Sequence, residues 1–195
     1  GQLNAEAPNI KVHFVNVPLD LTAQLTDMSI DLAVCADFNI WQGVRKETLF
    51  QDKTIIAVAE GHSLLDQENV YINDLLKYPS VFYDPSFSPR ASKLYAPPNT
   101  DIPLMEWNPR MQISSAQIVD QLFVAAETDA VVRVPLSMFN YMKKRLQLRS
   151  ISVEGEDSSY PTNLFWSEEQ DQSEGGKWLR SKIKEVLENC QYIER

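Results

Sequence analysis

The sequence feature that most constrains the fold is an apolar strand pattern that comes very late in the chain. Residues 162–166 read TNLFW, and a polar, acidic loop separates them from GKWLRSKIKEVLENC, which has helical spacing. Earlier in the chain, two runs of alternating strand and helix patterns are already sufficient for two sheets. A late strand that returns to the first sheet requires two crossings between two lobes, which is the arrangement of a hinge over a cleft.

The first run of elements is predicted in residues 10–65. IKVHFVNV (10–17) carries apolar residues on both faces, and LTAQLTD (21–27) has helical spacing behind Asp20, a candidate N-cap. The near-continuous apolar run IDLAVCA (30–36) is typical of a buried parallel strand. Strand, helix and strand at this spacing predict a βαβ unit. KTIIAVAEGHSLL (53–65) adds a strand that ends in a turn.

The second run follows a short helix and a strand at residues 80–84. Residues 85–110 contain six prolines, so we expect no long regular element there. The later segments alternate strand and helix: RMQISS, SAQIVDQLFVAAE, DAVVRVP, LSMFNYMKKR and LQLRSISV. The sequence therefore predicts an α/β chain of two Rossmann-like lobes. Lobe I is expected in residues 1–83 and 163–195, and lobe II in residues 84–162. The crossings are expected near 80–85 and 158–164, and Trp178 should be buried where the last helix packs on lobe I.

Charge and cysteine content exclude several classes of function. The net charge is −9, from 27 acidic and 18 basic residues, which opposes binding to DNA phosphates. The one dense basic run, residues 143–145, lies near a predicted helix end, where cations favour the macrodipole. No apolar run approaches the length of a membrane helix. Cys35 and Cys190 lack metal-ligand spacing and are read as free thiols of a reducing compartment, with a disulfide as the weaker alternative.

The residues that enzymes use are scarce. Both histidines have ordinary explanations: His13 alternates with apolar residues, and His62 lies in a turn where a capping role is expected. Nucleophile-elbow, P-loop and dinucleotide-binding motifs are all missing, and the chain has only six glycines. The pair Glu168 and Glu169 lies in a polar loop. The sequence therefore favours binding over catalysis, with no catalytic residue, metal site or cofactor.

Three polar residues near predicted strand ends are candidates for binding. Ser114 and Ser115 stand where a strand gives way to a helix, so they either cap the helix or hold a carboxylate at its positive end. Arg133 interrupts an apolar strand and requires an ion-pair partner or a ligand.

Ligands of α/β sheets bind beyond the carboxyl ends of strands, so we predict a small-molecule site in the cleft between the lobes. Trp166, at the end of the late strand, is included with a core role as its alternative. The predicted site residues are Asp37, Phe38, Tyr83, Asp84, Pro85, Ser114, Ser115, Arg133, Pro135 and Trp166.

The order and spacing of five segments resemble a known family. They are APNIKVHFV, QLTDMSIDLAV, LFQDKTIIAVAEGHSL, ETDAVVRVP and LFWSEEQDQSEGGKWLR. Over essentially the entire chain, the pattern is similar to the effector-binding domain of LysR-type transcriptional regulators. The nodulation and leucine-operon subgroup is the nearest, and the fold is that of type 2 periplasmic binding proteins. Asp27-Met28-Ser29 replaces the family's usual glycine turn, and Ser63 replaces its proline. Glu127 and Arg133 depart from the subgroup's residues, so effector identity is not carried over.

The resemblance implies a cytoplasmic regulator whose partner is a small-molecule effector. It also implies a homodimer or homotetramer, no membrane contact, and DNA binding only through an N-terminal helix-turn-helix domain outside this chain. Members of the family begin this domain with a central strand, joined to the next parallel strand by a crossover of a dozen or more residues. Because fewer residues than that precede Ile10, we expect this central strand to be missing here. The alternative is an extracytoplasmic solute-binding protein of a transporter, which shares the fold.

Overall fold

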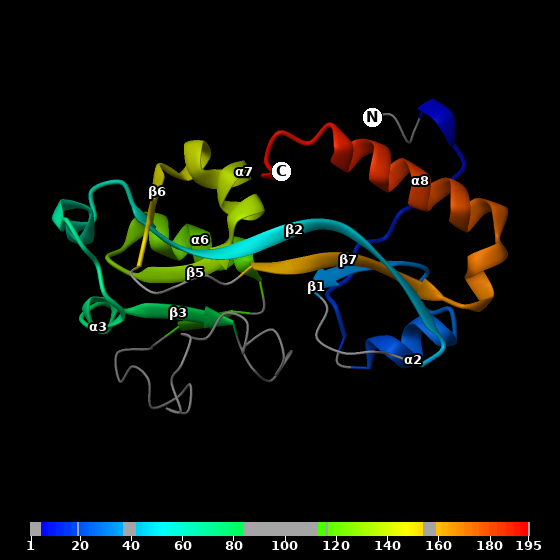
Figure 1. Cartoon of the computed structure of the whole chain (residues 1–195), viewed down its shortest axis with the longest axis horizontal. Coiled ribbons are helices and arrows are strands. Elements are labelled where there is room, and N and C mark those ends of the chain that lie inside the picture. Colours follow the sequence, from blue (N-terminus) through cyan, green and yellow to red (C-terminus); the bar gives the residue numbers. More distant parts are fainter. Residues whose placement is uncertain are drawn as a thin grey trace.

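The computed structural model describes residues 5–18, 20–36, 42–83, 113–115, 117–153 and 159–194 (Figure 1). Within them, the helices and strands are α2 (Leu21–Thr26), β1 (Ala33–Ala36), β2 (Val44–Ala59), η1 (Ser63–Asp66), α3 (Ile72–Leu75), β3 (Ser80–Tyr83), β4 (Ile113–Ser115), α6 (Ile118–Glu127), β5 (Val131–Pro135), α7 (Leu136–Leu146), β6 (Leu148–Ile151), β7 (Ser159–Ser167), η2 (Glu169–Gln172) and α8 (Glu174–Glu188). The predicted mixed α/β class is confirmed. The proline-rich residues 85–110 lie outside the described residues.

One long strand, β2, runs through both lobes. Its residues 44–53 pair with β7, and its residues 54–59 pair with β5 and β6. The strand order is β1-β7-β2-β5-β3-β4, with β6 pairing β2 off this path. Figure 1 shows β2 extending from the α8 end of the molecule to the β6 end. We call the half with β1 and β7 lobe I, and the half with β3 to β6 lobe II.

The position of the first crossing differs from the one expected from the sequence. The chain passes from lobe I to lobe II inside β2, between Lys53 and Thr54, because these residues pair with β7 and β5 respectively. Residues 54–83 therefore belong to lobe II and not to lobe I, and the crossing is not at 80–85. The first half of β2, VRKETLFQDK, is mostly charged or polar, so the sequence gives little sign that it continues the apolar strand. β7, the late strand, does return to the first sheet.

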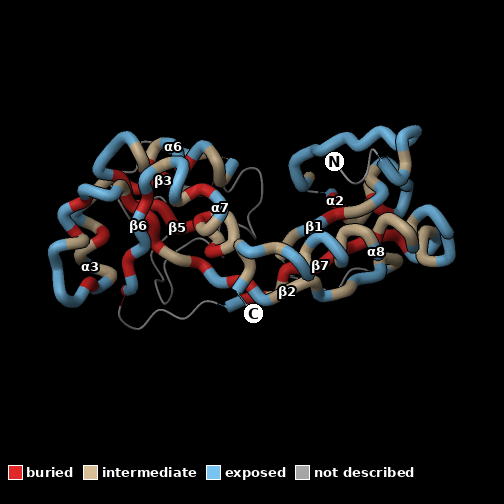
Figure 2. Tube along the Cα trace, turned by 90° about the horizontal axis from the view of Figure 1, so that it is seen from above, coloured by how far each residue is buried: buried red, intermediate tan, exposed pale blue. Residues whose placement is uncertain are grey.

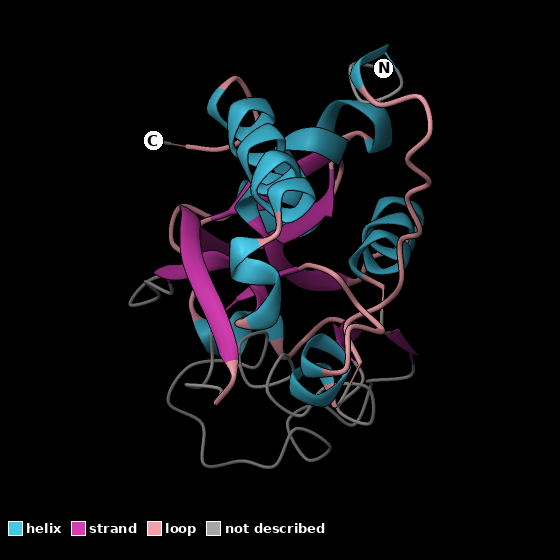
Figure 3. Cartoon of the chain, turned by 90° about the vertical axis from the view of Figure 1, so that its right-hand side faces the viewer, coloured by secondary structure: helices cyan, strands magenta, loops and turns pink. Residues whose placement is uncertain are grey.

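The predicted strand at residues 10–17 is not formed. These residues have no strand pairing among the described part of the chain, and β1 pairs antiparallel with β7 instead of joining a parallel βαβ unit. The apolar side chains of this segment are exposed, most of all Phe14 at 95%. Figure 3, viewed from the lobe I end, shows the N-terminal residues as a long loop beside the strands. The alternating pattern is a strand pattern, but a strand needs a neighbour to pair with.

Lobe II has an apolar core on each face of its sheet. On one face, α6 and α7 pack on alternate residues of β5, including Val132 and Val134. On the other face, Ile56 and Val58 of β2 pack with η1, α3 and β6. The buried residues of β5 and α7 stand out in Figure 2. The predicted elements of this lobe from residue 118 to residue 151 are confirmed.

Lobe I is covered less completely. α2 buries Leu21 and Leu25 against Phe165 and Ala33 on one face of the sheet. In α8 only Arg180 is buried, although the helix is 15 residues long. Trp178, for which the sequence predicted burial, is half-buried, and Val186 is 57% exposed. The amphipathic spacing of α8 identified a helix, but this lobe offers it little apolar surface to cover.

Two local features that the sequence singled out have a structural explanation. The turn at residues 27–29 places Met28 in the left-handed region, with φ of 63°. Asp27 supports the turn by accepting hydrogen bonds from the hydroxyl and the backbone N–H of Ser29, and these bonds lower the pKa of Asp27.

His62 is a capping residue as expected, because its Nδ1 accepts a hydrogen bond from the N–H of Leu64. Cys35 and Cys190 form no disulfide in the described part of the chain, and each is half-buried.

The two crossings are held to lobe II by Asp52, which is 8% exposed. Its carboxylate accepts bonds from the N–H of Lys53 at 2.8 Å, and from the N–H and hydroxyl of Ser137 at 3.3 and 2.5 Å. Ser159, at the start of β7, donates to the Asp52 carbonyl at 3.3 Å. A single residue of β2 therefore contacts both the first turn of α7 and the returning strand.

We expect Asp52→Ala to destabilise the chain by roughly 1–2 kcal/mol, because it leaves the first turn of α7 without its carboxylate acceptor. The measurement is the free energy of unfolding from denaturant titration. Asp66→Ala, which removes an exposed carboxylate from η1, is the matched control and should change stability little. Equal effects of the two substitutions would contradict the role given to Asp52.

Candidate functional site

The carboxyl ends of three strands of lobe II meet at the edge of the sheet that faces lobe I. β2 enters lobe II from lobe I, and β5 runs antiparallel to it, so β5 ends at Pro135 on the lobe I side. β3 and β4 are parallel to β5 and to each other, with Tyr83 opposite Ser115. The structure therefore brings Tyr83, Ser115 and Pro135 to one edge, beside the crossing.

Ser115 lies at the start of α6 but does not cap the helix in the usual way. The N-cap is Gln117, which makes no side-chain capping bond. The hydroxyl of Ser115 accepts from the N–H of Gln117 at 3.0 Å and donates to the carboxylate of Asp120 at 2.9 Å. Asp120 lies in the first turn, where its negative charge offsets the positive helix end. This helix end therefore attracts an anion less strongly than the sequence suggested.

A hydrogen bond joins the start of α6 to the N-terminal segment. The side-chain amide of Gln117 donates to the side-chain oxygen of Asn16 at 2.6 Å, across 101 residues of sequence. Asn16 belongs to the extended residues that precede α2, so this bond links the front of the chain to lobe II. Sequence reasoning missed both residues. The one available signal was that Asn16 interrupts an apolar alternation.

Two buried amides each have an atom without a hydrogen-bond partner. Among the described residues, the buried side-chain atoms in this condition are Oε1 of Gln121 and Nδ2 of Asn163. Gln121 is 0% exposed and Asn163 is 1% exposed. An unsatisfied buried polar group costs roughly 1–3 kcal/mol, so such atoms require an explanation.

The two amides lie in different lobes, each next to a strand end. Gln121 is one turn along α6 from Gln117, and its Nε2 donates to the carbonyl of Ser115 at 3.2 Å. Asn163 lies in β7 opposite Cys35, near the end of β1, and its Oδ1 accepts from the hydroxyl of Thr48 at 2.7 Å. Since Thr48 could equally accept from a flipped amide, one polar atom of Asn163 lacks a partner in either orientation. The sequence gives only a weak signal for these residues, a polar side chain within an apolar pattern.

The other predicted site residues have varied positions. Ser114 is exposed in β4, and Arg133 is buried in β5. Arg133 pairs with Ile56 and lies on the opposite face of the sheet from Val132 and Val134, which α6 and α7 cover. The structure does not describe Asp37, Phe38, Asp84, Pro85 or the side chain of Tyr83.

Trp166 is not brought together with these residues. It pairs with Arg45, near the end of β7 remote from the crossing. Its Nε1 donates to the carboxylate of Asp171 at 2.9 Å, and the guanidinium of Arg180 lies 4.5 Å from the ring centroid. Arg180 also donates to the carbonyls of Gln170 and Asp171. These contacts anchor η2 and α8, which is the core role that the sequence left as the alternative.

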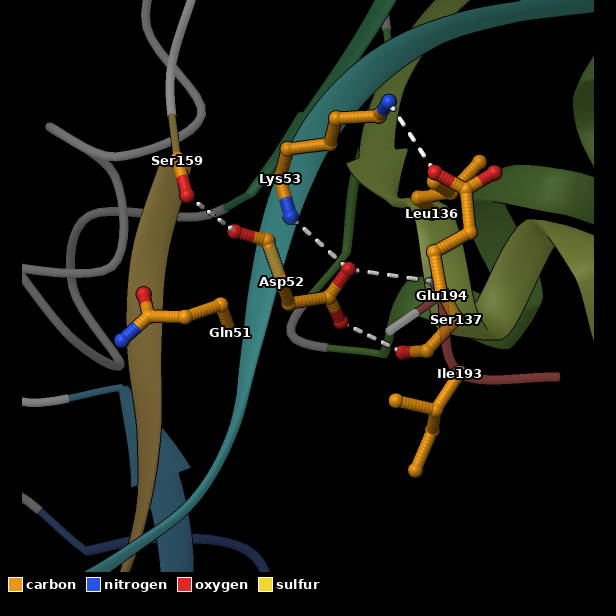
Figure 4. Close-up of a pocket in the computed structure, with 8 residues that line it drawn as sticks. All are labelled: Gln51, Asp52, Lys53, Leu136, Ser137, Ser159, Ile193 and Glu194. Atoms are coloured by element: carbon orange, nitrogen blue, oxygen red, sulfur yellow. Dashed lines mark hydrogen bonds and ion pairs between the residues drawn. The ribbon is translucent and has the colours of Figure 1, made fainter.

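A small pocket of about 170 Å³ lies at the crossing itself (Figure 4). Its polar groups already satisfy one another: Asp52 binds Ser137, and Lys53 forms an ion pair with Glu194 at 3.1 Å. The lining residues are Gln51, Asp52, Lys53, Leu136, Ser137, Ser159, Ile193 and Glu194. The pocket therefore lies where β2, α7, β7 and the C-terminal residues contact one another, and we do not assign it to the effector. Among the described residues there is no cluster of metal-ligating side chains, and no helix is long and apolar enough to cross a membrane.

Comparison with known proteins gives a consistent result. The family model described as the LysR substrate binding domain matches residues 1–188. A putative transcriptional regulator from Vibrio parahaemolyticus has a similar structure, with a TM-score of 0.77 and 20% identity over 97% of this chain and 86% of that one. The regulatory domain of MetR, a LysR family regulator from N. meningitidis, gives 0.71 and 12% identity over 100% and 88%.

A third similar structure contains a ligand. The effector binding domain of QuiR in complex with shikimate has a TM-score of 0.62 and 14% identity, covering 87% of this chain and 77% of that one. At these identities the structures show a common fold.

We expect Gln121→Met to leave the free energy of unfolding unchanged or to raise it by about 1 kcal/mol. Methionine keeps the bulk of the side chain and removes the unsatisfied acceptor, at the cost of the bond to the Ser115 carbonyl. Chemical denaturation of the ligand-free chain is the measurement. Leu122→Ala, at the neighbouring buried position, is the contrast and should cost roughly 2–5 kcal/mol. A loss of stability in Gln121→Met comparable to that of Leu122→Ala would show that the amide is structural.

Proposed function

Because the chain belongs to the family of LysR substrate binding domains, we propose that it is the ligand-sensing regulatory domain of a DNA-binding transcription regulator. The effector binds between the two lobes, beyond the strand ends of lobe II. The observation that carries this proposal is the pair of buried amides, Gln121 in lobe II and Asn163 in lobe I, that each have an unused polar atom. A ligand that satisfies both would recover the cost of leaving them unpaired.

The polar atoms at the site indicate the chemistry of the effector. Asn163 offers a donor or, with its amide flipped, an acceptor; Gln121 offers an acceptor and is bonded to Ser115 through its other amide atom. A hydroxyl or a primary amide on the ligand could satisfy both requirements, because each donates and accepts. Asp120 disfavours a carboxylate placed directly at the α6 end. We therefore favour a small neutral metabolite that carries hydroxyl or amide groups, in place of the acidic one that the helix end alone suggests.

Binding between the lobes also suggests how a signal is produced. The bond from Gln117 to Asn16 crosses from lobe II to the N-terminal segment, so a ligand inserted beside α6 competes with it or reorients it. A ligand with different affinities for two lobe arrangements shifts the population towards the one it binds better. The remaining members of the proposed site are Asp37, Phe38, Tyr83, Asp84, Pro85, Ser114, Arg133 and Pro135. Trp166 is assigned to packing.

The wider properties proposed for this protein follow from the family. The domain catalyses no reaction, uses no cofactor, acts in the cytoplasm, and reaches DNA through a separate helix-turn-helix domain. The alternative, a solute-binding protein of a transporter, has no specific support, since the matching family model is that of the LysR proteins.

The effector can be sought by a thermal-shift screen of small polar metabolites, followed by calorimetric titration. At 100 times its dissociation constant, a true effector should stabilise the chain by about 2.7 kcal/mol. Gln121→Met, Ser115→Ala and Tyr83→Ala should each weaken binding by roughly tenfold or more, since each removes a polar partner of the ligand. Arg149→Ala, which removes an exposed ion pair with Glu60 in lobe II, is the control and should bind as the parent does. Parental affinity in all three variants would refute the site.

We further propose that the chain self-associates with twofold symmetry, lobe I of one copy against lobe II of the other. Phe14, in the segment that precedes α2 of lobe I, and Phe123, on α6 of lobe II, are exposed aromatic residues that such a contact would cover. Phe14→Glu and Phe123→Glu should each raise the dissociation constant of the dimer in sedimentation equilibrium, whereas Tyr71→Glu, at an exposed site beside α3, should not. A monomeric mass for the parent chain at high concentration would contradict the proposal.

A further inference from the structure

The C-terminal residues 191–194 leave the last helix of lobe I and reach lobe II. α8 is attached to lobe I through Arg180, which binds the η2 carbonyls, and through Lys184, which forms an ion pair with Glu47 of β2. After α8 ends at Glu188, the chain passes beside α7, and Figure 1 shows the C-terminus close to that helix. Residues 191–194, here called the tail, therefore follow a helix anchored in one lobe and lie against the other.

Three different contacts hold the tail to lobe II and to the crossing. The side-chain amide of Asn140 in α7 donates to the carbonyl of Tyr192 at 3.3 Å. The rings of Tyr141 and Tyr192 meet edge to face, with centroids 5.1 Å apart. Lys53, on the lobe I side of the crossing, forms its ion pair with Glu194. The half-buried Tyr192 is the centre of this attachment.

The tail also contacts the place where the chain passes between the lobes, next to Asp52 of β2 and Ser159 of β7. Figure 4 shows Ser137 beside Glu194, and Ile193 and Glu194 line the pocket at the crossing together with Asp52, Ser137 and Ser159. These three residues are the ones that tie β2, α7 and β7 together. Rotation of one lobe about the two crossing strands must therefore move the tail relative to α7.

We propose that residues 191–194 are a strap that limits the angle between the lobes. β2 passes from lobe I into lobe II, and Ser159 at the start of β7 is bonded to β2 at the same place. Contacts at one place oppose rotation of the lobes weakly, and an attachment from α8 to α7 at a second place opposes that rotation further. The strap is releasable because its contacts are one hydrogen bond, one aromatic pair and one exposed ion pair, each of which water or another side chain can replace.

This role is separate from effector binding and requires no ligand. The strap contacts the outer side of α7 and the crossing, and none of its residues is among the proposed effector contacts. The angle between the lobes is then controlled in two ways, by the effector and by the tail. When the tail is released from α7, the lobes can move further apart than they can while it is bound.

The test measures the distance between the lobes directly. Spin labels at Ala23→Cys in α2 and Glu127→Cys in α6, both exposed, are placed in a chain carrying Cys35→Ser and Cys190→Ser. Truncation after residue 190 removes the strap and keeps the C-cap of α8 at Asn189. We expect the distribution of label distances, from electron spin resonance, to broaden and extend to longer values. Hydrogen exchange of residues 136–140 should accelerate by roughly tenfold, equivalent to about 1.4 kcal/mol.

Two further variants separate the strap from general destabilisation. Tyr192→Ala should broaden the distance distribution less than truncation does, and it serves as the test if the truncated chain does not fold. Arg149→Ala, the control for an exposed ion pair in lobe II, should leave the distribution unchanged. Parental distance distributions in the folded truncated chain, or in Tyr192→Ala if truncation prevents folding, would overturn the proposal. Broadening of the same size in Arg149→Ala would overturn it as well.

Discussion

The structure depends on one uninterrupted strand. β2 lies between β5 and β6 in lobe II and, without a break, pairs with β7 in lobe I. At the point where it changes lobes, Asp52 uses its carboxylate to hold the first turn of α7 and its carbonyl to receive Ser159 of the returning strand. Because the same residue contacts β2, α7 and the start of β7, a few hydrogen bonds at the crossing join the two lobes.

The proposed effector site, with one buried amide in each lobe, comes at a cost in stability. Gln121 and Asn163 keep buried polar atoms unpaired, while the residues around them pack as an ordinary core. Proteins tend to depart from full hydrogen-bond satisfaction where binding requires it. At the start of α6, by contrast, the hydroxyl of Ser115 and the carboxylate of Asp120 already satisfy each other.

Lobe I is the less complete half of the molecule, and this affects its outer elements. The extended residues 10–17 expose an alternating set of apolar side chains, and α8 buries only Arg180. α8 is held through Arg180, Trp166 and ion pairs more than through a broad apolar face. The C-terminal tail then extends this helix across the crossing to α7, so the least buried lobe supplies the third connection to the better packed one.

The sequence by itself determined the elements and the class of the fold. Helical spacing located α6, α7 and α8, and apolar runs located β3, β5 and β7, because local periodicity and backbone preference act over a few residues. Tertiary structure decided what depends on neighbours far away in sequence. Residues 10–17 have the pattern of a strand but pair with no other described segment of the chain. The polar half of β2 is a strand because β7 pairs with it, and Trp166 is core because Arg180 and Asp171 contact it. The unpaired amides of Gln121 and Asn163 belong to the same group, since whether a buried polar atom finds a partner depends on contacts that no local pattern contains.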